Sequence, residues 1–106
     1  MVTEGCYVDG KLNYSILFSD VEVEESATVE YSVVMRNTKI GKSAQVKYTI
    51  IADDAVIEDG AIIGAAPEDY KNPDKWGIAV IGQGARVKSG QVVLPGEMVE
   101  PNSVRG

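Results

Sequence analysis

The stretch VEYSVVMRNTKIGKSAQ, residues 29–45, has a similar stretch on each side of it. LNYSILFSDVEVEESAT (12–28) precedes it, and VKYTIIADDAVIEDGAI (46–62) follows it. The three blocks align without gaps at a period of 17 residues. A fixed period of this size is typical of a solenoid, in which each repeat packs only against its neighbours.

Several columns of this alignment hold one type of residue. Because residues one period apart stack in a solenoid, we expect the tyrosines of the third column to form a ladder. The twelfth column extends backwards to Cys6, which predicts that this cysteine lies in the core. The conserved columns are Tyr14, Tyr31 and Tyr48; Ser15, Ser32 and Thr49; Ile16, Val33 and Ile50; and Cys6, Val23, Ile40 and Ile57.

Each block divides into pieces of six, five and six residues, with FSDVE (18–22) as an example of the five-residue piece. We expect the first aliphatic residue of each hexad, and the residue four places later, to point inward. The polar residues between them face solvent. In LNYSIL, VEYSVV and VKYTII this rule places Ile16, Val33 and Ile50 inside. Such short segments, rich in Val, Ile and Thr, predict parallel strands bonded from coil to coil.

The C-terminal part resumes the pattern, with Ile81, Val87, Val93 and Val99 six residues apart. The spacing from Ile57 to Ile81 is 24 residues, which we interpret as one period of 17 plus seven extra residues. These extra residues lie in GAAPEDYKNPDKWG (64–77), whose prolines, glycines and charges are typical of a loop. The sequence therefore predicts an all-β coil with one protruding loop at about residues 64–78.

The composition limits the possible functions. The 106 residues fit a single domain, and a net charge of −6 argues against nucleic-acid binding. The single cysteine excludes an internal disulfide, and no apolar run is long enough to span a membrane. We therefore expect a cytoplasmic protein. The sequence has no histidine, the commonest general base and metal ligand.

The motif aliphatic-Gly-x-x-Ala-x, present as IGKSAQ (40–45) and IGQGAR (81–86), resembles the hexapeptide-repeat family. This resemblance implies a left-handed parallel β-helix. The family includes acyltransferases, trimeric carbonic anhydrases and the C-terminal parts of sugar-nucleotide pyrophosphorylases. The first two normally use histidines, which disfavours them here.

A closer resemblance is to the C-terminal domain of the bacterial glucose-1-phosphate adenylyltransferases (ADP-glucose pyrophosphorylases). It rests on EGCYVDGKLNYSILF (4–18), YSVVMRNTKIG (31–41) and NPDKWGIAVIG (72–82). It implies that residues 1–106 are one β-helix domain of a longer enzyme, which makes ADP-glucose and pyrophosphate from ATP and glucose 1-phosphate in glycogen biosynthesis. Magnesium and ATP would belong to a preceding catalytic domain, so this chain would be inactive alone and hold no cofactor.

The resemblance also implies partners, namely the enzyme's own catalytic domain and other subunits of a tetramer, and a role in carrying effector signals. The loop is the candidate interface, because it holds the only tryptophan; the alternative is that Trp76 folds back onto the coil. A cluster of cations is a candidate site for an anionic effector, unless neighbouring carboxylates pair with it. The interface candidates are Tyr70, Asn72, Pro73, Asp74, Lys75 and Trp76, and the effector candidates are Arg36, Lys39, Lys42 and Lys47.

Two other functions stay open. One is a complete acyltransferase-like enzyme, with a glutamate in place of the histidine base. The other is a free-standing scaffold. The carboxylate pairs at Asp53-Asp54, Glu58-Asp59 and Glu24-Glu25 fall on the exposed part of the hexads, where water solvates them, so no metal site is predicted.

Overall fold

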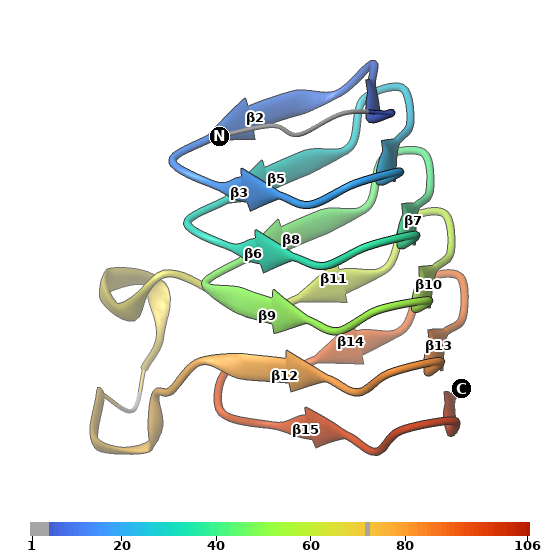
Figure 1. Cartoon of the computed structure of the whole chain (residues 1–106). Helices are drawn as coiled ribbons and strands as arrows, with labels where there is room; N and C mark the ends of the chain where they lie inside the picture. Colours follow the sequence, from blue (N-terminus) through green and yellow to red (C-terminus); the bar gives the residue numbers. More distant parts are fainter. Residues whose placement is uncertain (1–4, 72) are drawn as a thin grey trace.

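The computed structural model describes residues 5–71 and 73–106. The chain winds as a left-handed parallel β-helix whose coils each contribute one short strand to three parallel sheets (Figure 1). Sheet A holds β3 (Ile16–Leu17), β6 (Val33–Val34), β9 (Thr49–Ile51), β12 (Ala79–Ile81) and β15 (Met98–Val99). Sheet B holds β1 (Tyr7–Val8), β4 (Glu22–Val23), β7 (Lys39–Ile40), β10 (Val56–Ile57), β13 (Arg86–Val87) and β16 (Val104–Arg105). Sheet C holds β2 (Lys11–Asn13), β5 (Thr28–Glu30), β8 (Gln45–Lys47), β11 (Ile62–Ile63) and β14 (Val92–Val93).

The core is a stack of aliphatic rows, as the hexad pattern predicts. In sheet C, Val29 pairs with Val46, and Val46 pairs with Ile63. All three side chains are fully buried. The small residues four places after each hexad start are also buried, including Ala27 and Ala44. Burial of an aliphatic side chain contributes about 1.5–3 kcal/mol, so these rows supply most of the driving force for folding.

The corners between strands are formed by residues in the left-handed backbone region. Asn37 has φ 62° and Asp54 has φ 61°, in the same place on successive coils. Asn and Asp adopt this region more readily than other residues with a side chain. The Asn37 side-chain amide donates a hydrogen bond to Asp54 Oδ1 at 2.8 Å, which ties the two corners together.

The five-residue piece lies at the tyrosine corner, so the predicted division of the block is wrong. Tyr31 takes the left-handed conformation with φ 51°, one residue earlier than the other corners do. Ser32 then turns inward and is 3% exposed, whereas Ile16 and Ile50 point outward and are each 38% exposed. The prediction that these isoleucines lie inside and the serines outside is therefore reversed.

Hydrogen bonds compensate for the burial of these hydroxyl groups. Ser32 Oγ donates to the Glu30 carbonyl oxygen at 2.8 Å and accepts the Thr49 backbone N–H at 3.1 Å. Ser15 Oγ makes the equivalent bonds, to the Asn13 carbonyl and from the Ser32 N–H. Because a bonded hydroxyl is tolerated inside a protein, this column of Ser and Thr can replace alanine in the core.

The protruding loop is confirmed, but its place in the coil differs from the prediction. Ile81 pairs with Ile51, not with Ile57, and Ile57 pairs with Val87. Because the pattern repeats every six residues, it is the same whether Ile81 is aligned with Ile51 or with Ile57. The spacing alone therefore did not determine which strand pairs with β12. The insertion runs from Gly64 to Ile78, between β11 and β12. It contains two short 3₁₀ helices, η1 (Pro67–Asp69) and η2 (Pro73–Lys75).

Cys6 contacts the core but not in the predicted column. Val8, not Cys6, pairs with Val23, because the first coil is shorter than the repeat. Cys6 is partly buried against the core cluster, and its thiol donates to the Phe18 carbonyl oxygen at 2.9 Å. Within residues 5–71 and 73–106, no helix has the length and apolar character needed to cross a membrane.

Candidate interface surface

The outward side chains of sheet A form a straight apolar row. Strand pairing places Ile16, Val33, Ile50, Val80 and Met98 side by side across the five coils. Figure 1 shows their strands stacked one above the other, from β3 to β15. We call these five residues the sheet A row. Each strand of sheet A thus presents an uncharged side chain to solvent.

The residue that follows each strand of sheet A extends this surface in the upper coils. Phe18 is 39% exposed, and Met35 and Ala52 are half-buried. The equivalent position is Gly82 in the next coil and Glu100 in the last. The apolar surface is therefore broadest over β3, β6 and β9. This contiguous apolar surface is therefore the candidate interface of the chain.

The predicted tyrosine ladder borders the sheet A row. The rings of Tyr14 and Tyr31 stack with centroids 5.1 Å apart, and those of Tyr31 and Tyr48 are 4.8 Å apart. Exposure falls along the ladder, from 82% at Tyr14 to 48% at Tyr31, while Tyr48 is half-buried. Burial, followed by the nearby carboxylate of Glu68, raises the pKa of Tyr48 above its ordinary value.

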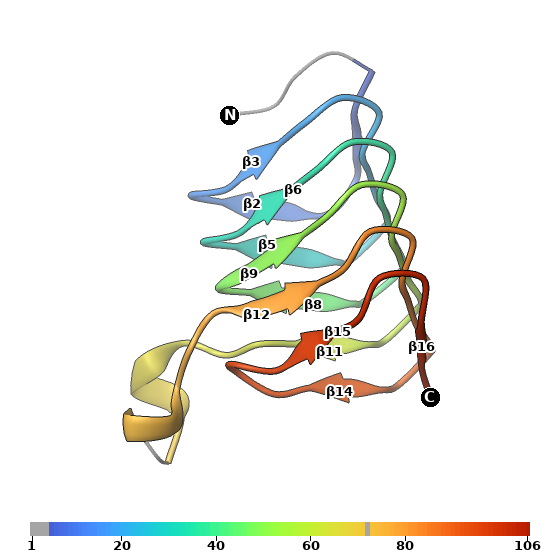
Figure 2. The same cartoon turned by 60° about the horizontal axis from the view of Figure 1, so that its bottom comes forward.

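The loop ends the ladder. The ring of Trp76 packs edge-on against Tyr48 at 5.6 Å, with an interplanar angle of 80°. The Trp76 indole N–H donates to the Ala65 carbonyl oxygen at 2.7 Å, which joins the two ends of the insertion. Trp76 thus folds back onto the coil, while the rest of the loop stands away from the stack (Figure 2).

A glycine starts the insertion for a steric reason. Gly64 has φ +71°, and a Cβ at this position would collide with the Lys47 carbonyl oxygen. Of the predicted interface residues, Tyr70 is half-buried, and Asp74 and Lys75 are exposed. Asn72 lies outside the described residues. Pro73 begins η2.

The four candidate effector residues are spread around the coil rather than gathered at one site. Lys39 lies on β7 of sheet B and Lys47 on β8 of sheet C, while Arg36 and Lys42 lie at two different corners. Lys39 lies 3.8 Å from Glu22, and Lys47 lies 3.8 Å from Glu30. Arg36 is 3.9 Å from Asp53. These carboxylates already neutralise three of the four cations.

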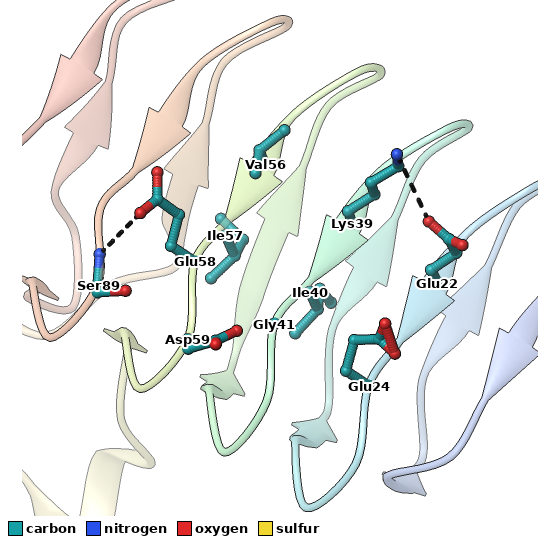
Figure 3. A pocket seen from close by; sticks show the side chains of 10 residues that line it. All are labelled: Glu22, Glu24, Lys39, Ile40, Gly41, Val56, Ile57, Glu58, Asp59 and Ser89. Atoms are coloured by element: carbon teal, nitrogen blue, oxygen red, sulfur yellow. Dashed lines mark hydrogen bonds and ion pairs between the residues drawn. The ribbon is translucent and has the colours of Figure 1, made fainter.

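A shallow groove crosses the outer face of sheet B, with the side chains of Glu22, Glu24, Lys39, Glu58 and Asp59 around it (Figure 3). Its carboxylates are partly engaged. Asp59 Oδ1 accepts the Lys42 backbone N–H at 2.9 Å, and Glu58 accepts from Arg86 at 2.7 Å. The bond from Arg86 lowers the pKa of Glu58, which makes this carboxylate a weak base. Among the described residues, no group of three His, Cys, Asp or Glu side chains could hold a metal ion.

The sheet A row was missed by sequence reasoning because three of its members were placed inside. One signal could have revealed them. In LNYSIL, Ser15 and Leu17 are two residues apart, as are Ser32 and Val34 in VEYSVV. Side chains two apart in a strand share a face. Leu17 lies six residues before Val23, and Val34 lies six before Ile40, so the hexad spacing places Leu17 and Val34 inside. Ile16 and Val33 must then point outward.

The model of a family described as "GlmU-like, C-terminal hexapeptide" matches residues 1–81 of the 106. None of the curated protein sequences compared matches the chain. A solved structure from Bacillus cereus, the BC4754 gene product, provisionally described as an acetyltransferase, matches 97% of this chain and 70% of its own. Its identity to this chain is 16% and its TM-score is 0.38, which is too distant a likeness to bear on function.

Proposed function

Because the chain belongs to the GlmU-like, C-terminal hexapeptide family, we propose that it is the assembly domain of a larger enzyme, a glucose-1-phosphate adenylyltransferase. The chemistry that joins ATP to glucose 1-phosphate takes place in another domain. The role of the β-helix is to hold subunits or domains together and to transmit changes between them. The family description, which places the hexapeptide repeats at the C-terminus, agrees with this arrangement.

The observation that supports an assembly role is the uncharged outer face of sheet A. Ile16 and Ile50 are each 38% exposed and Met98 is 52% exposed, in one continuous row. The tyrosine ladder lies along one edge of it, and aromatic side chains are enriched in protein interfaces. A catalytic face would instead need polar groups that converge on a substrate.

The motifs of residues 4–18, 31–41 and 72–82 support the particular enzyme. They resemble the glucose-1-phosphate adenylyltransferases over most of the chain. A regulatory role for the cations at Arg36, Lys39, Lys42 and Lys47 has weaker support, because three of them already lie beside carboxylates. The loop can extend the interface through Trp76, which packs against Tyr48 of the ladder, and through Tyr70, Asp74 and Lys75 of the same loop.

The second candidate function is acyl transfer, since hexapeptide repeats also form acyltransferases. Such an enzyme needs a general base near neutral pH. Glu58 lines the groove on sheet B, but its bond from Arg86 lowers its pKa and weakens it as a base. This argues against Glu58 as the base of such an enzyme.

The test uses the complete product of the gene that encodes the chain. We expect it to form ADP-glucose from ATP and glucose 1-phosphate and not to transfer acetyl groups from acetyl-CoA. Ile50→Lys should weaken subunit or domain association by about tenfold or more, the usual effect of disrupting a central interface residue. Ile62→Lys is the matched control, because Ile62 is an outward isoleucine of sheet C with 39% exposure. Acetyl transfer without adenylyl transfer would refute the proposal, as would equal effects of the two substitutions.

A further inference from the structure

The last coil of the β-helix, residues 91–105, has polar side chains at inward positions where the coil above it has alanine or valine. Figure 2 shows its strands, β14 to β16, at the lower end of the stack. Because the coils are in register, each inward residue can be compared with the one directly above it, which is buried in every case. The replacements are Ala61 by Gln91, Ala79 by Glu97, Ala85 by Ser103 and Val87 by Arg105.

Two of these polar residues, Arg105 and Glu97, form an ion pair at the lower end of the core. The Nη1 and Nη2 atoms of Arg105 donate to the two oxygens of the Glu97 carboxylate, each at 3.4 Å. Both residues are half-buried, and they come from different sides of the coil, since Arg105 lies on β16 of sheet B and Glu97 directly precedes β15 of sheet A. A pair with two parallel bonds holds both side chains in a defined geometry. The pair therefore spans the lower end of the core between the two sheets.

The lower edge of sheet C has backbone groups that a further strand would use. In β14 the carbonyl oxygens of Gln91 and Val93 accept N–H groups from the coil above. The backbone groups of successive residues in a strand point to opposite neighbouring strands. The carbonyl oxygen of Val92 and the N–H group of Leu94 therefore point to the lower edge, where β14 is the last strand of the sheet. Unpaired groups at such an edge are a template for the addition of another strand.

Arg105 and Glu97 occupy both of these edge groups. Arg105 Nη1 donates to the Val92 carbonyl oxygen at 3.3 Å, and Glu97 Oε1 accepts the Leu94 N–H at 2.7 Å. The Leu94 N–H, and then Arg105, lower the pKa of Glu97 against the opposing effect of burial, so this carboxylate is charged at neutral pH. The two side chains thus make hydrogen bonds that a further strand of sheet C would otherwise make.

We propose that Arg105 and Glu97 form a cap that ends the β-helix by blocking the addition of another strand to sheet C. The cap occupies the edge groups of Val92 and Leu94, and it places charges where a further coil would need small or aliphatic side chains. Inward-pointing charges are one means by which natural sheets avoid pairing at their edges. These side chains, rather than the place of the coil in the sequence, make it unsuitable as a base for another coil. The cap does not depend on the proposed enzyme.

The first test gives the last coil the residue types of the coil above it, in the complete product of the gene. The cap variant carries Arg105→Val and Glu97→Ala. The matched control carries Arg86→Val and Glu58→Ala, which remove an ion pair of 2.7 Å from the outer face of sheet B. Each variant loses one positive and one negative charge, so the net charge of the chain stays at −6. Sedimentation velocity over a range of protein concentrations measures the association of each.

We expect the cap variant to associate through its uncovered edge at concentrations about tenfold lower than the unaltered protein, or lower still, since burial of one aliphatic side chain is worth at least that factor. The control should associate as the unaltered protein does. Equal association of the two variants would overturn the proposal.

A second measurement does not need the cap variant to fold. Among the described residues, the Leu94 amide donates only to the Glu97 side chain, so its hydrogen exchange reports on the cap directly. We expect this amide to exchange at least about tenfold more slowly than in an unfolded chain. Glu97→Ala should remove that protection, while the Gly64 amide keeps its bond to the Val93 carbonyl oxygen and its slow exchange. An unprotected Leu94 amide in the unaltered protein would overturn the proposal, as would full protection in Glu97→Ala.

Discussion

The outer faces of sheets A and B have the same backbone but opposite chemistry. On sheet A the outward positions are Ile, Val, Ile, Val and Met, while on sheet B they include Glu22, Lys39 and Arg86. The inward row behind sheet A is aliphatic and buried in every coil, and the row behind sheet B is so from Val23 to Val87. The fold therefore depends on the inward rows alone, and the outward rows are free to differ. Sheet B pairs its charges across coils, whereas sheet A exposes apolar groups.

The largest expected difference lies between two adjacent residues of β9. Ile51 is fully buried and Ile50 is 38% exposed. We expect Ile51→Ala to lower the free energy of unfolding by about 2–5 kcal/mol, because it leaves a cavity in the core. Ile50→Ala should cost less than about 1 kcal/mol in the dissociated chain, while weakening assembly. Denaturant unfolding measures both, and equal losses would contradict the outward placement of Ile50.

The tyrosine corner should show the next largest effect. Ser32 is buried and holds two backbone groups, so Ser32→Ala leaves the Thr49 N–H without its acceptor. Leaving a buried donor unpaired costs about 1–3 kcal/mol. Ser89→Ala, at an exposed position on the sheet B side, serves as the control and should cost little. A Ser32→Ala protein as stable as the control would mean that the serine column does not support the corner.

The contact between loop and ladder should contribute less. Trp76→Phe keeps a ring against Tyr48 but removes the hydrogen bond to the Ala65 carbonyl oxygen. A typical bond of this type contributes about 0.5–1.5 kcal/mol, so we expect a small loss of stability and faster hydrogen exchange in the loop. Sheet A strands above β12 should keep their protection. If hydrogen exchange accelerates throughout sheet A instead, the hydrogen bond between Trp76 and Ala65 supports the whole sheet and not only the loop.

The smallest effect should come from the charged face. Arg86 lowers the pKa of Glu58, so the unfolded chain binds more protons than the folded one near the carboxylate pKa. The stabilisation that Glu58 gains from Arg86 is present at pH values above the pKa of Glu58 in the unfolded chain. It is lost as the pH falls through the lower pKa that Glu58 has in the folded protein. We expect Glu58→Gln to remove the contribution of Glu58 to the pH dependence of the free energy of unfolding. Added salt should weaken the effect, since exposed pairs are screened. A pH profile that is the same in the variant would show that Glu58 gains nothing from Arg86.

Sequence reasoning predicted the parts of this molecule that repeat. The period, the three-sided coil, the tyrosine ladder and the loop follow from columns of like residues, and the structure confirms them. Sequence reasoning failed at the tyrosine corner, where a backbone conformation determines which side chains face the core. Tyrosine rarely adopts a positive φ, so nothing in the local preference of Tyr31 indicates that it turns the corner. That single turn determines whether Val33 belongs to the core or to the surface.

The loop also shows where this fold accepts a change of length. Gly64 to Ile78 occupy the tyrosine corner, and yet β12 pairs with β9 through the same three positions, Ala79 with Thr49 to Ile81 with Ile51. The coils above and below keep their rows. The corner is thus a suitable insertion site. A foreign peptide placed between Ala65 and Trp76, with the hydrogen bond from the Trp76 indole to Ala65 kept, would be displayed on a rigid β-helix. The coils of the β-helix would not change.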